Sequence, residues 1–256
     1  MREGVGRRLA AAAVAAFFAV PLLALVVRAG ADEWRAPDLW PQDFGLRGVD
    51  VALGGTGARD ALVNSLVVAL VTTLIALLVG WPAARVLGER RLQRPALVFL
   101  LLAMPLLVPP YATGAGLTEW FIRLDLSETI AGLVLAHLVV VLPYVVVVLM
   151  SGFGPRVTEL EEMARTAGAG PLRKLAWVTL PAVRPTLAAA AFLGFLVSWS
   201  QYGSSLAVGA GRPMLPLVML PFIGSDPQVA AVLALLFLAP AVVALAIAAR
   251  AARSPL

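Results

Sequence analysis

Six long apolar runs cover most of this chain and decide what it can fold into. A membrane-spanning helix needs about 20 predominantly apolar residues to cross a hydrocarbon core of about 30 Å. Six segments meet or approach that length: Leu9–Val27, Ala61–Leu87, Pro95–Leu117, Ile130–Met150, Ala182–Val208 and Val229–Ala249. Only 14% of the 256 residues are charged, against about 25% in a typical soluble domain. We therefore predict an all-α membrane protein with six transmembrane helices.

The rest of the composition narrows the class further. The chain has no cysteine, which excludes disulfides, thiolate metal sites and cysteine nucleophiles. Its isoelectric point is near 10.6, but the basic residues lie between the apolar runs and not in one patch, so we expect membrane lipid and no nucleic acid as a partner. Arg7 and Arg8 precede the first run as in a signal peptide, but the run is longer than the apolar region of such peptides, so we expect it to remain as a span.

The basic residues also predict the orientation, because cytosolic loops are enriched in Lys and Arg. With the N-terminus inside, fourteen of the 20 basic residues fall on the cytosolic side: Arg2, Arg7, Arg8, Arg85, Arg90, Arg91, Arg94, Arg156, Arg165, Arg173, Lys174, Arg184, Arg250 and Arg253. Both termini are therefore expected in the cytosol. The chain then forms a single transmembrane domain, residues 1–256, with a polar outer loop at 28–60 and a large inner loop at 151–181.

Three further segments carry specific expectations. Residues 118–129 read as a short outer loop, with an interfacial helix anchored by Trp120 and Phe121. The connection 209–228 contains Pro213, Pro216 and Pro221 and reads as extended or re-entrant. Within the third run, Pro105 and Pro109-Pro110 are denser than a simple kink requires, so this stretch either kinks a helix or lines a path through the membrane.

The inner loop contains the one polar segment between apolar runs with a clear helical pattern. Residues 158–168 read as an amphipathic helix, in which Thr158 and Glu161 have capping-box spacing and Glu161 and Arg165 can pair at i,i+4. The predicted apolar stripe consists of Leu160, Met163, Ala164 and Ala167. Gly170-Pro171 is predicted to end the helix. Small residues on its surface favour docking against another protein over lying on lipid headgroups.

The inner loop resembles a known motif. The spacing Glu162-x-Ala164-x-x-x-Gly168, nine residues, Val178-x-Leu180-Pro181 is similar to the EAA motif of permease subunits of bacterial binding-protein-dependent ABC importers, with Met163 in place of the second alanine. In that family the loop forms a coupling helix that contacts the nucleotide-binding subunit. The resemblance thus implies these ATPase-coupling residues: Glu161, Glu162, Ala164, Arg165, Gly168, Ala169, Leu172, Val178, Leu180 and Pro181.

The same resemblance implies the partners and the location. ATP and Mg would be bound by a cytosolic ATPase dimer, and this chain would bind no cofactor and would not itself be an enzyme. It would pair with a second copy or a homologous permease, receive its solute from an external binding protein, and lie in the bacterial plasma membrane as a multi-pass protein. The segment Ser198–Gly203 resembles the branch that handles iron(III), thiamine, polyamines, sulfate and molybdate, except that Gln201 stands where that branch often has an acid.

The translocation path has several candidate residues. They are polar, aromatic or proline side chains within the apolar runs: Asn64, Pro109, Tyr111, Trp199, Gln201 and Tyr202. An amide within a span must find hydrogen-bond partners. Gln201 and Asn64 therefore suit either contact with the solute or a polar clamp between helices, and the sequence leaves both open.

One histidine and the acidic residues bear on other classes of protein. His137 lies in an apolar run that has no Asp, Glu or Cys, so we expect a neutral histidine bonded to a neighbouring helix and no metal site or proton relay. The alternative class is an ion-gradient-driven secondary transporter, which would need a buried acid as its coupling site. None of the 15 acids lies clearly inside a predicted span, which disfavours it. An intramembrane enzyme would need a nucleophile–base or metal set, which His137 alone does not supply.

Overall fold

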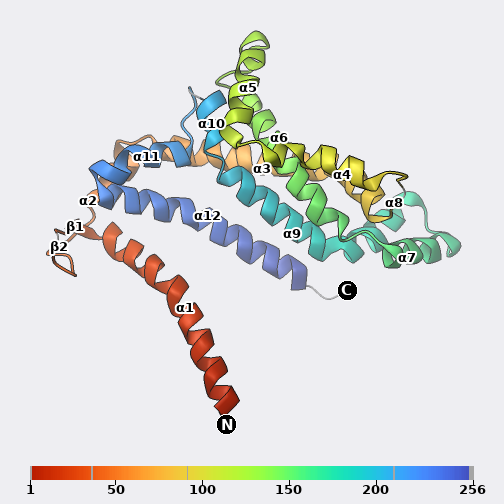
Figure 1. Cartoon of the computed structure of the whole chain (residues 1–256), viewed down its shortest axis with the longest axis horizontal. Coiled ribbons are helices and arrows are strands. Elements are labelled where there is room, and N and C mark those ends of the chain that lie inside the picture. The colour runs from red at the N-terminus through yellow and green to blue at the C-terminus, as the bar shows by residue number, and fades with distance from the viewer. Residues whose placement is uncertain (1, 36, 91, 210, 254–256) are drawn as a thin grey trace. The chain divides into compact units, whose positions relative to one another are not determined.

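The computed structural model describes residues 2–35, 37–90, 92–209 and 211–253, and these fold almost entirely as helices (Figure 1). The helices of the first half are α1 (Arg2–Ala29), α2 (Arg47–Gly54), α3 (Ala58–Gly88), α4 (Pro95–Ala103), α5 (Pro110–Arg123) and α6 (Ile130–Met150). Those of the second half are α7 (Pro155–Thr166), α8 (Pro171–Lys174), α9 (Leu180–Trp199), α10 (Gly203–Val208), α11 (Leu215–Ser225) and α12 (Pro227–Arg253). A 3-10 turn, η1 (Met104–Leu107), follows α4, and a π-helical segment, η2 (Leu175–Thr179), joins α8 to α9.

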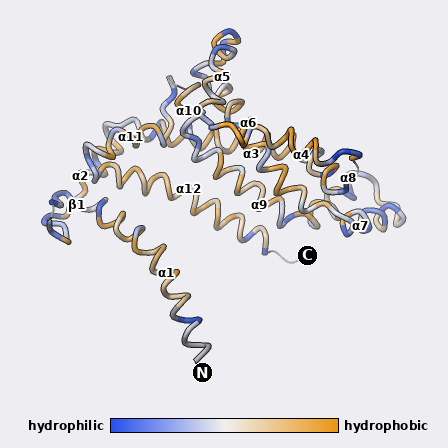
Figure 2. Tube along the Cα trace, in the orientation of Figure 1, coloured by the Kyte–Doolittle hydropathy of each residue, from blue (hydrophilic) through white to orange (hydrophobic). Residues whose placement is uncertain are grey.

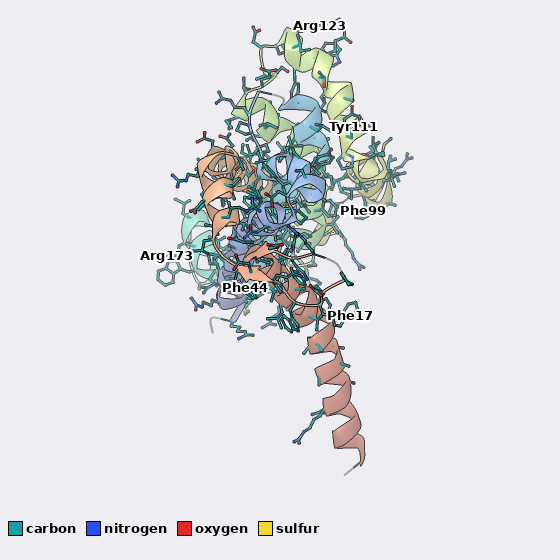
Figure 3. The ribbon with its side chains drawn as sticks, turned by 90° about the vertical axis from the view of Figure 1, so that its left-hand side faces the viewer. Phe17, Phe44, Phe99, Tyr111, Arg123 and Arg173 are labelled. Carbon is teal, nitrogen blue, oxygen red and sulfur yellow. The ribbon has the colours of Figure 1, made fainter. Side chains whose placement is uncertain are left out.

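Long apolar helices confirm the membrane character. Five helical segments are long and apolar enough to cross a membrane, namely α1, α3, α6, the continuous α8–α9 helix and α12, and a sixth is added if the bent pair α4 and α5 counts as one span. Figure 2 shows the hydrophobic colour along these helices and the hydrophilic colour along α7. Large apolar side chains such as Phe17 and Phe99 lie on the surface (Figure 3), where hydrocarbon takes the place of a protein core.

The third predicted span, Pro95–Leu117, is wrong as a single helix. The chain runs through α4 and η1, becomes extended at Val108 and Pro109, and starts α5 at Pro110, with a bend of 91° between the two helical parts. A proline lacks an amide hydrogen and disfavours helical backbone in the residue before it, so the Pro109-Pro110 pair ends one helix and begins the next.

The fifth predicted span, Ala182–Val208, has the wrong boundaries. Its helix begins at Pro171, runs through η2 and α9 and ends at Trp199, and the shorter α10 begins at Gly203 after a break. Residues 172–178 are therefore already part of the helix, and Pro171 starts a helix where it was expected to end one. Proline is favoured in this position because the first amides of a helix have no intrahelical partner.

Three predicted loops contain regular structure. Residues 118–123 continue α5 as helix, where Trp120 is exposed but Phe121 is buried against Ala136 and Val208 and does not anchor at an interface. The proline-rich connection 209–228 contains the apolar helix α11. The loop 28–60 contains helix α2 and two short antiparallel strands, β1 (Ala31–Glu33) and β2 (Asp43–Phe44), with Ala31 opposite Phe44.

The chain divides into two compact units, residues 1–59 with 218–239 and residues 60–217 with 240–256. In the first unit, Gln228 of α12 is buried and its Nε2 donates a hydrogen bond to Oδ1 of Asp32 at 2.6 Å. The guanidinium of Arg47 binds both carboxylate oxygens of Asp226, at 2.7 and 3.0 Å. These hydrogen bonds lower the pKa of Asp226. Polar contacts thus fix the loop 28–60 to the start of α12.

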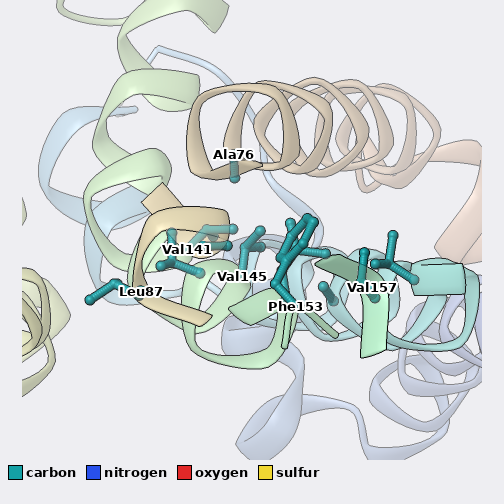
Figure 4. Close-up of a cluster of buried hydrophobic side chains, with 11 residues drawn as sticks. Ala76, Leu87, Val141, Val145, Phe153 and Val157 are labelled. Carbon is teal, nitrogen blue, oxygen red and sulfur yellow. The ribbon is translucent and has the colours of Figure 1, made fainter. Parts of the chain in front are cut away.

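The second unit contains the main hydrophobic core. Figure 4 shows its cluster of buried side chains, which comes from α3, α6, α7, α9 and the turn after α6: Ala76, Ala84, Leu87, Val141, Val145, Val146, Leu149, Phe153, Val157, Val183 and Ala190. Helices α6 and α9 approach closely at Gly194, where an added Cβ would lie 2.8 Å from the side chain of Val145. The ring of Trp81 meets Phe153 edge to face, with centroids 5.0 Å apart. This core links α7 to the membrane-spanning helices.

Candidate functional site

Helix α7 occupies the predicted inner loop, but it begins and faces differently from the expectation. Pro155 is its first residue, and Gly154 is its N-cap, which has no side chain to cap the helix. Thr158 lies one turn inside the helix, where its hydroxyl is 3.4 Å from the carbonyl of Gly154. The predicted capping box at Thr158 and Glu161 is therefore wrong. The buried face carries Val157 and Glu161, whereas Met163 of the predicted stripe is 60% exposed.

The end of α7 is set by Gly168. Its φ is +83°, which is a left-handed conformation. Glycine adopts this conformation freely, whereas any residue with a Cβ is destabilised in it. The amide of Gly168 donates to the carbonyl of Arg165, and the amide of Ala169 donates to that of Ala164. These two bonds form a Schellman motif, which satisfies carbonyls at the helix end. The helix consequently ends at Thr166, earlier than the predicted stop at Gly170-Pro171.

The carboxylate of Glu161 is the centre of a buried polar cluster. Its side chain is 7% exposed and accepts hydrogen bonds from Nη2 of Arg85 in α3 and from the hydroxyl of Thr179 in η2, and Nζ of Lys174 lies 3.3 Å away. Arg85 also donates to Glu89 at 2.8 Å. The predicted pair of Glu161 with Arg165 is wrong, because Glu161 points inward while Arg165 is exposed.

Electrostatics keep this carboxylate charged. Burial alone would raise the pKa of Glu161, but hydrogen bonds from Thr179, Arg85 and Lys174 outweigh it and bring the pKa below its usual value. Glu161 is therefore ionised at neutral pH, and it joins α7 to α3, α8 and η2 through charged contacts. The sequence analysis did not predict Arg85, Lys174 and Thr179 as partners of Glu161. The one available signal was Arg85, an arginine near the end of an apolar run, which needs a partner for its charge.

The other predicted coupling residues lie around this cluster. Five of them are exposed: Glu162, Arg165, Gly168, Leu172 and Leu180. Trp177, which was not predicted, is exposed beside Leu180. Four are half-buried: Ala164, Ala169, Val178 and Pro181. A groove of about 1230 Å³ runs beside α7 and is lined by residues that include Arg156, Leu160, Trp177, Leu180 and Arg184. The exposed surface of α7 and the groove together form a polar and apolar face suited to a protein partner.

The two helix breaks of the second unit lie against each other. Helices α5 and α10 pack together, so the break before α5 meets the break before α10. A Cβ on Gly203 would lie 2.6 Å from the amide nitrogen of Tyr111, so only glycine fits there. The hydroxyl of Ser204 lies 3.3 Å from the carbonyl of Pro110. Non-helical backbone at membrane depth is tolerated where it is buried in protein or lines a cavity.

The predicted path residues divide into three groups. Pro109, Tyr111 and Tyr202 are exposed at the two breaks, and Figure 3 places Tyr111 at the start of α5. Trp199 is 2% exposed and stacks on Phe195. Gln201 is 7% exposed, and its side-chain oxygen Oε1 accepts a hydrogen bond from the hydroxyl of Ser204 at 3.4 Å. Asn64 lies elsewhere, where its Nδ2 donates to the carbonyl of Pro213 at 3.0 Å. Asn64 therefore has the contact of a polar clamp between distant segments, whereas the side chain of Gln201 bonds within its own segment.

His137 is fully buried beside the second break. Its Nδ1 lies 3.0 Å from the hydroxyl of Ser198 in α9, and its Nε2 lies 3.0 Å from the hydroxyl of Ser205 in α10. The prediction of a histidine bonded to neighbouring helices is confirmed. In the described residues, no group of three or more His, Cys, Asp or Glu side chains could hold a metal ion.

The chain was compared with known proteins. No family model matches it. It is 31% identical over 199 residues to the ABC transporter permease protein ORF1 of Streptomyces antibioticus, an alignment that covers 73% of this chain and 82% of that protein. It is 29% identical to the molybdenum transport system permease protein ModB of Mycobacterium tuberculosis, over 94% of this chain and 90% of ModB. The molybdate/tungstate transport system permease protein WtpB of Pyrococcus abyssi is 32% identical over 149 residues, 58% of this chain and 60% of WtpB.

A solved structure shares the fold. The crystal structure of a bacterial ABC transporter involved in the import of the acidic polysaccharide alginate contains a chain that superposes with a TM-score of 0.72. The match covers 96% of this chain and 95% of that one at 16% sequence identity. The overall arrangement of helices is therefore one already seen in an experimental structure.

Proposed function

Because this chain belongs to the ABC transporter permeases, we propose that α7 is the helix through which it is coupled to a cytosolic ATPase. The chain is the membrane-spanning permease subunit of a binding-protein-dependent ABC importer. Such a permease works with ATPase subunits and an external binding protein. ATP hydrolysis takes place on the ATPase subunits, and the chain itself binds neither ATP nor Mg.

The cluster around Glu161 carries the coupling proposal. A helix that transmits force must be joined rigidly to the helices that move, and Glu161 joins α7 to Arg85 of α3 and to Lys174 of α8. Since α8, η2 and α9 form one continuous helix, a displacement of α7 passes directly to α9. ATP binding to the partner then stabilises one access state over the other through α7.

The orientation follows from the charges of the second unit. Arg85, Arg156, Arg165, Arg173, Lys174 and Arg184 all lie on α7 and α8 or on the adjoining ends of α3 and α9. We place this end in the cytosol, in agreement with the enrichment of cytosolic loops in basic residues. The bent pair α4 and α5 then counts as the third of six spans, and both termini are cytosolic in a bacterial plasma membrane.

The translocation path is proposed to run past the two helix breaks. Pro109, Tyr111 and Tyr202 are exposed there, while Trp199 and Gln201 support them from the buried side. One permease cannot enclose a path alone, so the exposed side of the breaks is completed by a second copy or by a homologous permease. Broken helices near the middle of the membrane form the binding sites of many transporters.

The cargo is proposed to be a tetrahedral oxyanion of the molybdate class. Two relatives are named for molybdenum and for molybdate/tungstate. None of the residues 109–111 and 200–203 at the breaks is acidic. They offer backbone, amide and hydroxyl groups to an anion, with no carboxylate to repel it.

Purification from the native membrane tests the proposal directly. The chain is extracted in mild detergent, its partners are identified by mass spectrometry, and the complex is reconstituted in vesicles with molybdate as the probe. We expect a soluble ATPase, a second permease subunit and ATP-dependent molybdate uptake. A complex without an ATPase would contradict the coupling proposal, and ATP-driven transport that excludes molybdate would contradict only the cargo.

Single-cysteine labelling tests the path. Because the chain has no cysteine, Tyr111→Cys and Tyr202→Cys each introduce a unique thiol. We expect both thiols to react with a water-soluble maleimide in the resting complex, and molybdate with the binding protein to slow the reaction. Leu133→Cys is the matched control, since Leu133 is fully buried in the same unit and should not react. Two unreactive tyrosine positions would place the path elsewhere.

A further inference from the structure

His137 connects the two sides of the break between α9 and α10. Ser198 lies in the last turn of α9 and Ser205 in the first turn of α10, and the imidazole binds one hydroxyl through each ring nitrogen, at 3.0 Å in both cases. His137, Ser198 and Ser205 are all buried to 99% or more. Among the described residues of α6, His137 is thus the one side chain that forms hydrogen bonds to both α9 and α10.

The network assigns the position of the imidazole proton. A serine hydroxyl has one hydrogen, and that of Ser205 donates to the backbone carbonyl of Gln201 at 2.6 Å. Ser205 can therefore only accept from His137, so the proton lies on Nε2. The other nitrogen, Nδ1, then accepts from the hydroxyl of Ser198. The chain of bonds has a single direction, from Ser198 through His137 and Ser205 to Gln201.

This chain of bonds ends on a carbonyl that the break leaves without a helical partner. Gln201 lies between the end of α9 and the start of α10. A free carbonyl at membrane depth must be satisfied by neighbouring side chains or water. Ser205 satisfies it, and His137 holds Ser205 in the rotamer that does so. The same break carries Tyr202, which is 41% exposed, and Gly203, which packs on the backbone of Tyr111.

We propose that His137 is a positioning residue of the translocation path, whose Nε2–H fixes the start of α10 and so holds Tyr202 beside the start of α5. The inference rests on the proposed path at the two breaks. His137 touches no exposed surface, so it acts through Ser205 and Gln201. Its essential feature is a hydrogen-bond donor at the Nε2 position, and the acceptor at Nδ1 is secondary because Ser198 can donate instead to a carbonyl one turn back in α9.

Two amide substitutions separate these two features. The amide nitrogen of His137→Gln reaches the position of Nε2 and keeps the donor to Ser205. The side chain of His137→Asn is shorter, so it keeps a hydrogen-bond partner for Ser198 but loses the donor to Ser205. In the reconstituted complex we expect His137→Gln to transport molybdate within about twofold of the unsubstituted chain and His137→Asn to lose roughly tenfold, the effect of one buried hydrogen bond of ordinary strength. Ser205→Ala should match His137→Asn, and the two changes combined should cost no more than either alone.

A second measurement does not depend on the cargo. In the purified complex, the thiol of Tyr202→Cys should react with maleimide at an altered rate when combined with His137→Asn, and at an unaltered rate with His137→Gln. Thr72→Val is the control, since it removes a buried hydroxyl that faces α6 at Val134, away from the break. Equal behaviour of the Gln and Asn variants in labelling would overturn the inference. If the labelling rates are as expected but the unsubstituted complex shows no ATP-driven uptake, the proposed function is contradicted and the inference about His137 is not.

Discussion

Replacing Glu161 with glutamine is expected to abolish ATP-driven uptake while the ATPase continues to hydrolyse ATP. The amide still bonds Thr179, but Arg85 and Lys174 lose their carboxylate. Removing one partner of a fully buried ion pair costs about 3–5 kcal/mol. Since the side chains of Arg85 and Lys174 are 28% exposed, we expect about 2–3 kcal/mol here, which corresponds to roughly 30- to 150-fold in the population of the docked helix. The measurement is molybdate uptake per ATP hydrolysed in vesicles.

The matched control for Glu161→Gln is Glu159→Gln. Glu159 lies two residues earlier in α7 and is exposed, so the same chemical change there should leave both rates unchanged. Uptake per ATP that stays normal in Glu161→Gln would mean that α7 is held to α3 by apolar packing alone. The role assigned to the charged cluster would then be wrong, although the docking of α7 on the ATPase could stand.

Replacing Gly168 with glutamate should also abolish uptake, and for two reasons. Its φ of +83° is unfavourable for a residue with a side chain, at a cost of about 1–2 kcal/mol, so the Schellman motif that ends α7 is strained. The new side chain meets no atom of this chain within 4 Å of its Cβ, so its bulk and charge point into the space that the ATPase would occupy. We expect normal insertion in the membrane and loss of the ATPase from the purified complex.

Two substitutions separate the backbone from the surface at this turn. Asparagine tolerates a left-handed backbone, so Gly168→Asn should retain more of the ATPase than Gly168→Glu. Gly170→Ala is the control for the surface, because Gly170 has a φ of −68° and open space around it. Full recovery of the ATPase with Gly168→Glu would contradict the docking of this turn, and equal loss with Gly170→Ala would show that the turn is sensitive to any change.

The sequence by itself determined the membrane class, the long apolar helices and the place of the inner loop. These features are local, because the length of an apolar run sets whether a helix can span the membrane. The bonding of His137 to neighbouring helices could also be predicted, because a buried polar side chain in a span must find partners on other helices.

The tertiary structure decided which residues act together. Glu161 was predicted to pair with Arg165 in its own helix, but its charge is satisfied by Arg85, which is 76 residues away in sequence. The third and fifth spans looked continuous because hydropathy counts apolar residues and does not record the direction of the helix axis. Only packing shows that their breaks meet at Tyr111 and Gly203, since contacts between distant segments depend on the fold as a whole and leave no periodic signal in either segment.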